Sequence, residues 1–208
     1  MSCDISIGRA LRCKTSVGGI KNIYFVPFGS MGTVTLDNWN RIQAVTGSPY
    51  AFKFEVLRDA DLDQRIQSSA VNGTTFVEQT LKATLKQLDF ATDNAIMKLS
   101  YSRPHIIVED LNGNYFMIGY KNGVDMRTSN VKTGRAMGDL SGYELTFTGE
   151  EKLLANYLVG TPLDLGFDVV DDSYEYFVDL FIARVLGDGG SVEATDCALE
   201  DLADLATE

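Results

Sequence analysis

The chain has 208 residues, of which 45% are hydrophobic and 23% are charged. This composition is ordinary for a globular protein and excludes a disordered chain, and the length suits one full domain with extensions. The net charge of −11 argues against a protein that wraps nucleic acid, because such binding needs clustered Lys and Arg side chains. No stretch approaches the ~20 apolar residues of a membrane-spanning helix, so the sequence predicts no membrane anchor.

Residues 1–30 form the first predicted region, an N-terminal arm that ends in the first strand. In the run IKNIYFVPFGS (20–30) both alternating sets of side chains are apolar. This pattern predicts a strand that is covered on both faces, either within the chain or by a neighbouring subunit. The second alternative makes Ile23, Phe25 and Phe28 candidate contacts between subunits. Trp39, for which a core or interface position is favoured over ligand stacking, is the fourth candidate.

The second predicted region, residues 31–158, reads mostly as β-strands. Residues 33–57 predict two strands around a turn at Gly47-Ser48-Pro49, and residues 76–86 alternate apolar and polar side chains, as a half-buried strand does. The charged segment 58–69 between them predicts a solvated loop or a hairpin tip.

A helix and a hairpin follow. Residues 89–102 place apolar side chains on one helical stripe, with Asp89 or Thr92 as the cap and Arg103-Pro104 as the stop. Residues 105–110 and 115–120 are strand-like, and Asn112-Gly113 between them favours a type I′ turn. Residues 121–142 predict a Gly-rich loop, and 143–149 a closing amphipathic strand.

The third predicted region, residues 159–208, changes in character. Residues 150–160 fit a short helix or an irregular edge equally well. Residues 174–186 repeat apolar side chains at helical spacing, and the acidic end forms a weak amphipathic tail. The predicted fold is therefore mainly β with flanking helices (α+β): an antiparallel β-barrel or sandwich with one helix packed on it, plus a C-terminal helical extension.

No residue pattern nominates an active site. The cysteines Cys3, Cys13 and Cys197 are widely spaced and form neither a disulfide framework nor a zinc motif. His105 is the single histidine, which excludes a His-based metal cluster and favours a structural role for this side chain. Without a nucleophile motif or a partner base, we expect no enzyme, no cofactor and no metal.

One resemblance emerges from the order of these elements. A strand, a helix after KQLDF (86–90), an Asn-Gly hairpin, a Gly-rich loop and GYELTFTGEE (142–151) resemble the major tail tube proteins of tailed phages, with their Hcp-like fold. The similarity covers roughly residues 73–155. It implies a structural virion protein, made in the bacterial host cytoplasm, whose six copies close a ring. The rings would stack into a tail tube that contacts other tail proteins and conducts DNA through its lumen.

If the strands 76–86, 106–110 and 143–148 line that lumen, their polar faces present Glu78, Glu109 and Glu144, diluted by Thr and by Lys82 and Lys86. Repeated around a ring, these carboxylates would disfavour phosphate contact, so that DNA slides. The alternative is that these are ordinary solvent-facing positions. Other functions also stay open: another ring-forming virion part, such as a tail terminator, head–tail connector, baseplate ring or capsid decoration protein, or a monomeric ligand-binding module. An enzyme would need a hidden pair of carboxylates.

Overall fold

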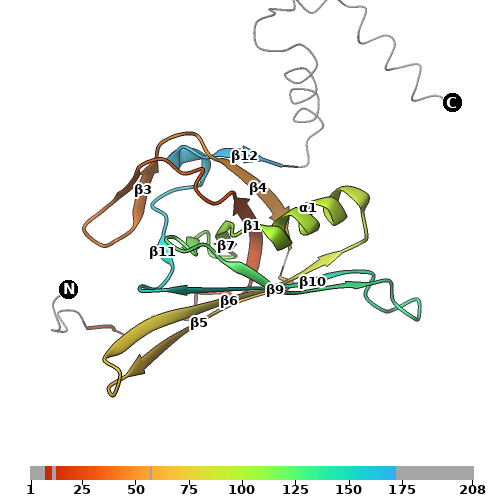
Figure 1. Cartoon of the computed structure of the whole chain (residues 1–208), viewed down its shortest axis with the longest axis horizontal. Helices are drawn as coiled ribbons and strands as arrows, with labels where there is room; N and C mark the ends of the chain where they lie inside the picture. Colours follow the sequence, from red (N-terminus) through yellow and green to blue (C-terminus); the bar gives the residue numbers. More distant parts are fainter. Residues whose placement is uncertain (1–7, 11–12, 57, 172–208) are drawn as a thin grey trace, which may run out of the picture. The chain divides into compact units, whose positions relative to one another are not determined.

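The computed structural model describes residues 8–10, 13–56 and 58–171, and these are mainly β, as predicted (Figure 1). The predicted helix at 174–186 and the acidic tail lie outside the described residues. The elements, in chain order, are β1 (Ile20–Val26), β2 (Val34–Leu36), β3 (Ile42–Val45), β4 (Tyr50–Glu55), β5 (Ala60–Ser69), β6 (Thr74–Lys86), α1 (Phe90–Tyr101), β7 (His105–Asp110), β8 (Tyr115–Ile118), β9 (Asp125–Lys132), β10 (Gly142–Glu151), β11 (Asn156–Tyr157), the 3₁₀ turn η1 (Leu163–Leu165) and β12 (Asp168–Val170).

Two packed sheets form most of the fold, and β2 and β3 pair as a third, two-stranded sheet. The larger sheet has the order β11-β8-β7-β1-β4-β12, and the smaller sheet has the order β5-β6-β10-β9. The core between them contains Phe25 and Ile106 from the larger sheet and Leu81 and Phe147 from the smaller sheet, all of them buried. The rings of Phe25 and Phe147 lie 5.3 Å apart across this core.

The strand β1 lies in the middle of the larger sheet, between β4 and β7. One of its faces contributes Ile23 and Phe25 to the core between the sheets. The other contributes Tyr24 and Val26 to a second core, which the β2–β3 hairpin and the segment around Phe167 cover. The chain itself therefore covers both faces of β1, which is the first of the two alternatives that the sequence left open.

The helix α1 forms where the sequence predicts it. The Asp89 carboxylate caps its start by accepting hydrogen bonds from the N–H groups of Ala91 (3.1 Å) and Thr92 (3.2 Å). Ile96 is buried in the core between the sheets. The Tyr143 hydroxyl of β10 donates to the Asp93 carboxylate at 2.6 Å and accepts from the Asp89 N–H at 3.1 Å, which fastens the first turn of α1 to the smaller sheet.

The β7–β8 hairpin is confirmed, but the predicted type I′ turn is wrong. In this turn Gly113 alone has a positive φ (+78°), and its N–H donates to the Asp110 carbonyl at 3.3 Å. The Asp110 carboxylate accepts from the N–H groups of Asn112 (2.8 Å) and Asn114 (2.7 Å). These bonds hold Asn112 in a conformation of negative φ, so that a type I turn followed by a left-handed glycine joins the strands.

Two segments predicted as loops contain strands of the smaller sheet. Within 58–69, β5 pairs with β6 along its whole length, and the hairpin tip is residues 70–73. Within 121–142, β9 pairs with β10, and the loop between these strands is 133–141. Both are edge strands that are rich in polar residues, and this hides the alternation that identifies a strand with one buried face.

Two further boundaries differ from the predictions. Residues 33–57 hold three strands, β2, β3 and β4, rather than two. The sandwich continues beyond the predicted boundary at residue 158, because β12 pairs in parallel with β4 and both Leu165 and Phe167 are buried in the second core. Residues 150–160 form the irregular edge that contains β11, and no helix.

Candidate assembly surface

The outer face of the smaller sheet, which we call the polar face, is the side that packs against nothing in the described chain. Directly paired residues of antiparallel strands share a face, so the pairs Glu78–Glu150 and Thr84–Glu144 between β6 and β10 place Glu78 and Glu144 on it together. Threonines lie between the charges. The charged residues on this face are Asp61, Asp63, Glu78, Asp125, Glu144, Glu150, Arg65, Lys82, Lys86 and Lys132.

Opposite charges on the polar face lie next to one another. The Lys132 ammonium contacts the Glu144 carboxylate at 2.6 Å, and this hydrogen bond lowers the pKa of Glu144. Lys86 pairs with Asp59 of the β4–β5 connection, and Gln67 donates to Glu78 at 2.8 Å. Lys82 lies directly opposite Asp61 in the register. The face is thus polar and close to neutral, with Lys82 and Lys86 among its carboxylates.

Glu109 does not share this face, and its predicted lumen position is wrong for the chain as folded. The residue lies on β7 of the larger sheet and is 6% exposed. Its carboxylate accepts hydrogen bonds from the Asn22 amide (2.6 Å), the Tyr24 hydroxyl (3.0 Å) and the Lys21 ammonium (3.0 Å). Burial raises the pKa of Glu109, but these donors outweigh it and lower the pKa overall.

The four predicted contacts between subunits divide into two pairs. Ile23 and Phe25 are 1% and 4% exposed in the chain's own core, so they present no surface to a neighbour, and that prediction is wrong. Phe28 and Trp39 are 52% and 68% exposed, so they are accessible for such a contact. The sequence could not separate the pairs, because all four are large apolar residues and their exposure depends on contacts between distant segments.

Trp39 stands at the tip of the β2–β3 hairpin, held in a fixed turn. The Asp37 carboxylate accepts from the N–H groups of Trp39 and Arg41, both at 2.8 Å, and from the Arg41 guanidinium at 2.7 Å. Desolvation raises the pKa of Asp37, but these hydrogen bonds lower it overall. The backbone of the tip is therefore ordered, while the indole lies in solvent.

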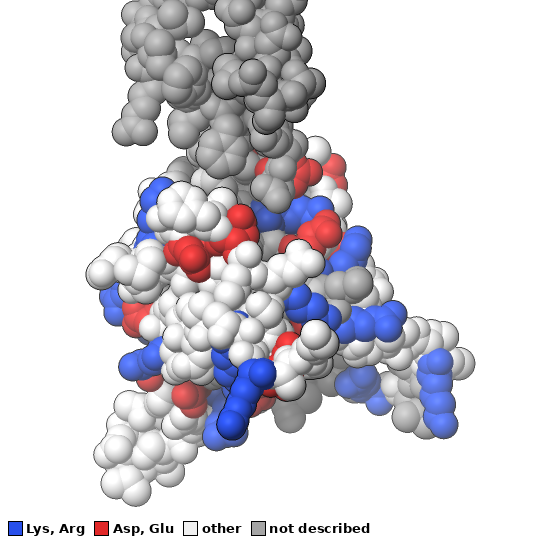
Figure 2. All heavy atoms as spheres, turned by 90° about the vertical axis from the view of Figure 1, so that its right-hand side faces the viewer, with Lys and Arg blue, Asp and Glu red and all other residues white. Residues whose placement is uncertain are grey.

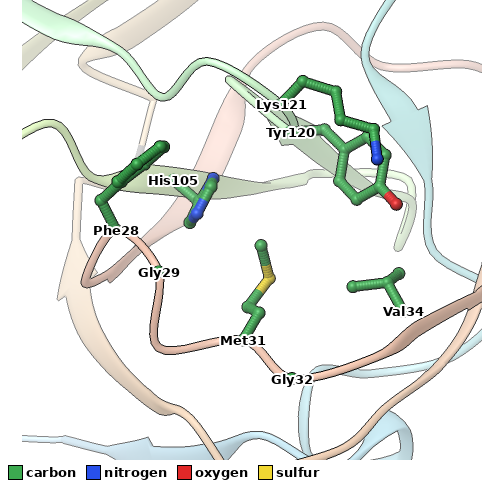
Figure 3. A pocket seen from close by; sticks show the side chains of 8 residues that line it. All are labelled: Phe28, Gly29, Met31, Gly32, Val34, His105, Tyr120 and Lys121. Atoms are coloured by element: carbon green, nitrogen blue, oxygen red, sulfur yellow. The ribbon is translucent and has the colours of Figure 1, made fainter.

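A cavity of about 330 Å³ lies at the base of the same hairpin; we call it the base cavity (Figure 3). Met31 and Val34 point into it from the β1–β2 connection and β2, opposite His105, Tyr120 and Lys121. The rings of Phe28 and His105 stack at 5.0 Å. Its lining residues are Phe28, Gly29, Met31, Gly32, Val34, His105, Tyr120 and Lys121.

Buried polar side chains from three strands fix one wall of the base cavity, the turn at residues 119–123. Gln79 of β6 accepts from the Gly119 N–H at 2.9 Å, and the His105 ring bonds the Gly119 carbonyl at 2.7 Å. Glu151 of β10 accepts from the N–H groups of Lys121 (2.7 Å) and Asn122 (2.8 Å). Burial lowers the pKa of His105, which favours the neutral ring and the structural role predicted for it.

Charge is distributed unevenly along the chain. Residues 1–171 contain 17 Lys and Arg and 19 Asp and Glu, a net charge of −2, so residues 172–208 carry the remaining −9. Figure 2 shows acidic and basic side chains interleaved over most of the described surface on the side that it presents. The acidity read from composition therefore belongs mainly to the C-terminal segment and not to the sandwich.

The chain was compared with protein-family models, curated proteins and solved structures. No family model, curated protein or solved structure matches it. Among the described residues, no three His, Cys, Asp or Glu side chains come together as metal ligands would. Within the same ranges, no helix combines the length and the apolar character that crossing a membrane requires.

Proposed function

We propose that this protein is a structural subunit of a phage tail tube, in which copies close into rings and the rings stack around a DNA-conducting lumen. The observation that carries the proposal is the polar face: a broad, near-neutral, threonine-rich sheet surface whose two edge strands are β5 and β9. In the tube this face lines the lumen. The order of elements between residues 73 and 155, which resembles tail tube proteins, supports the same assignment.

The edge strands provide a way to close the ring. In the described chain, β5 pairs only with β6, and β9 pairs only with β10. An exposed edge presents unpaired N–H and C=O groups that pair readily with another strand. If β5 of one copy pairs with β9 of the next, the small sheets join into one continuous sheet, and a head-to-tail contact of this kind closes into a ring.

The polar face also suits the passage of DNA. Tight binding to DNA requires cations that are free to neutralise phosphates and release counterions. Here Lys132 and Lys86 are engaged by Glu144 and Asp59, and Lys82 lies opposite Asp61. Threonine hydroxyls between these pairs keep the surface hydrated without adding charge. DNA would therefore meet a hydrated surface with little net charge and slide along it.

Two measurements on the purified protein test this function. Light scattering over a range of concentrations should show growth beyond the 22.8 kDa chain, and negative-stain electron microscopy should show rings or stacked tubes with an open centre. A protein that remains a single chain up to near-millimolar concentration would contradict the proposal. Particles that are closed shells or filaments without a central opening would also contradict it.

A further inference from the structure

The base cavity and the exposed Trp39 lie at opposite ends of one hairpin. Val34, at the start of β2, lines the cavity, whereas Trp39 stands beyond the end of β2, in the turn that leads to β3. The indole is 68% exposed and does not line the cavity of its own chain. One chain therefore carries a protruding aromatic side chain and an open cavity of mixed polar and apolar lining at two separate places.

Several groups that line the cavity have chemistry that contacts aromatic rings favourably. Its volume of about 330 Å³ lies at the lower end of the roughly 300–1,000 Å³ found for small-molecule sites. Met31 offers a thioether, which contacts aromatic rings favourably. The Lys121 ammonium lies 4.4 Å from the centre of the Tyr120 ring, at the position where a cation can also attract a second aromatic face. The half-exposed Phe28 ring would be covered by an entering side chain.

We propose that Trp39 of one copy inserts into the base cavity of the next copy, as a latch between neighbours. The inference rests on the proposed ring assembly and adds a specific contact to it. Because the inserted residue and the cavity are different surfaces of the same chain, the contact is head-to-tail, as ring closure requires. The hydrogen bonds to Asp37 fix the backbone that carries the indole, so little backbone freedom is lost when it inserts.

The latch adds selectivity to the strand pairing and does not replace it. A tryptophan buries roughly 150–250 Å², far below the roughly 1,200 Å² of a stable interface. Buried tryptophans are nevertheless frequent hot spots, and truncating one weakens binding by at least about tenfold. We expect Trp39→Ala to raise the concentration needed for half-assembly by that factor, and Trp39→Phe to restore part of the loss.

The chain contains a single tryptophan, so its fluorescence reports on the latch directly. A donor protein carries Phe28→Glu, which blocks its own cavity and keeps Trp39. Phe28 is 52% exposed, so this change leaves the core intact. An acceptor protein carries Trp39→Ala, which leaves its cavity open and removes its tryptophan fluorescence. A matched control acceptor carries both changes. The donor is mixed in turn with each acceptor, and light scattering follows assembly in the same samples.

We expect the open acceptor to shift donor emission to shorter wavelength and the control acceptor to leave it unchanged. An equal shift with both acceptors would overturn the latch, because Trp39 would then be buried elsewhere. Assembly without any shift would also overturn it, while leaving the proposed tube intact. If scattering detects no assembly of the unmodified protein, the proposed function fails, and the latch fails with it. Met31→Glu replaces Phe28→Glu if circular dichroism finds the first donor unfolded.

Discussion

In the six-stranded sheet both faces are covered by the chain itself, whereas the four-stranded sheet covers one face and leaves the other polar. The central strand of the first, β1, is apolar on both sides because it packs in two cores. The central strands of the second, β6 and β10, alternate strictly between the core and the polar face. The first sheet thus stabilises the subunit, and the second presents the surface from which we infer its function.

The largest expected effect on stability comes from a substitution on the buried face of the smaller sheet, and it is compared with a substitution on the polar face. Phe147 is fully buried on β10, and Phe147→Ala should lower the free energy of unfolding by about 3–5 kcal/mol, because it leaves a cavity between the sheets. Thr148→Val, the next residue on the polar face, should change it by no more than about 0.5 kcal/mol. Urea unfolding measures both, and similar losses for the two variants would contradict the assignment of faces.

A second variant probes the buried carboxylate of the larger sheet. Glu109→Ala removes the acceptor of Asn22, Tyr24 and Lys21 and should lower the free energy of unfolding by about 1–3 kcal/mol, because buried donors lose their partner. An unchanged unfolding midpoint in urea would show that Glu109 is accessible to solvent, as a lumen position would be.

The pH dependence of stability also tests whether the Glu109 carboxylate is buried and hydrogen-bonded. The folded chain lowers the pKa of Glu109 below its ordinary value of 4.5, so the carboxylate stabilises the fold above that pH. This contribution is lost as the pH falls through the lowered pKa. Asp110 and Asp125, whose pKa values are also lowered, act in the same direction. Glu109→Gln should therefore flatten part of the acid-side decline in thermal stability, and an unaltered profile would count against the buried network.

A substitution in the β7–β8 turn of the larger sheet should lower the stability of the fold by a comparable or smaller amount. Gly113 has a φ of +78° and no neighbour close enough to clash with an added Cβ, so Gly113→Val isolates the strain of the backbone. The expected loss is about 1–3 kcal/mol. Gly138→Ala, in the open loop of the smaller sheet, is the control and should alter the melting temperature little. Equal melting temperatures for the two variants would rule out the left-handed turn.

Charge reversal on the polar face should affect stability least and function most. Glu78→Lys with Glu144→Lys disturbs only surface contacts, which contribute little to the stability of the fold. In assembled tubes the added cations should retain DNA, and retention should weaken as salt rises. The control, Glu55→Lys with Asp168→Lys, makes the same change of charge on the larger sheet. DNA retention by the control alone would place the lumen on the other sheet.

The sequence predicts elements well where each residue follows its local pattern. Asp89 and Pro104 delimit α1, and the alternation in 76–86 identifies β6, because capping and half-burial leave direct periodic signals. The edge strands β5 and β9 were not predicted. An edge strand is largely exposed to solvent, so its sequence does not need a regular alternation of apolar residues. In β5 the inward side chains Ala60 and Leu62 are separated by charges that suggest a loop.

The candidate surfaces were harder to predict than the elements. Glu78, Glu109 and Glu144 occupy similar alternating positions, yet only pairing between distant strands decides that Glu109 is buried against Asn22 and Tyr24. The base cavity likewise joins segments near residues 28–34, 105 and 120, and no local pattern links them. The exposure of Trp39 depends on the Asp37 turn, whose Asp-x-Trp-x-Arg spacing was a usable but unspecific signal.

A density map of the assembled protein, at a resolution that traces strands, tests the central claim most directly. We expect a ring whose bore is lined by the polar face, with Glu78 and Glu144 toward the centre and β5 of each copy paired with β9 of the next. A map in which β5, β6, β10 and β9 face outward, or in which the larger sheet lines the bore, would contradict it.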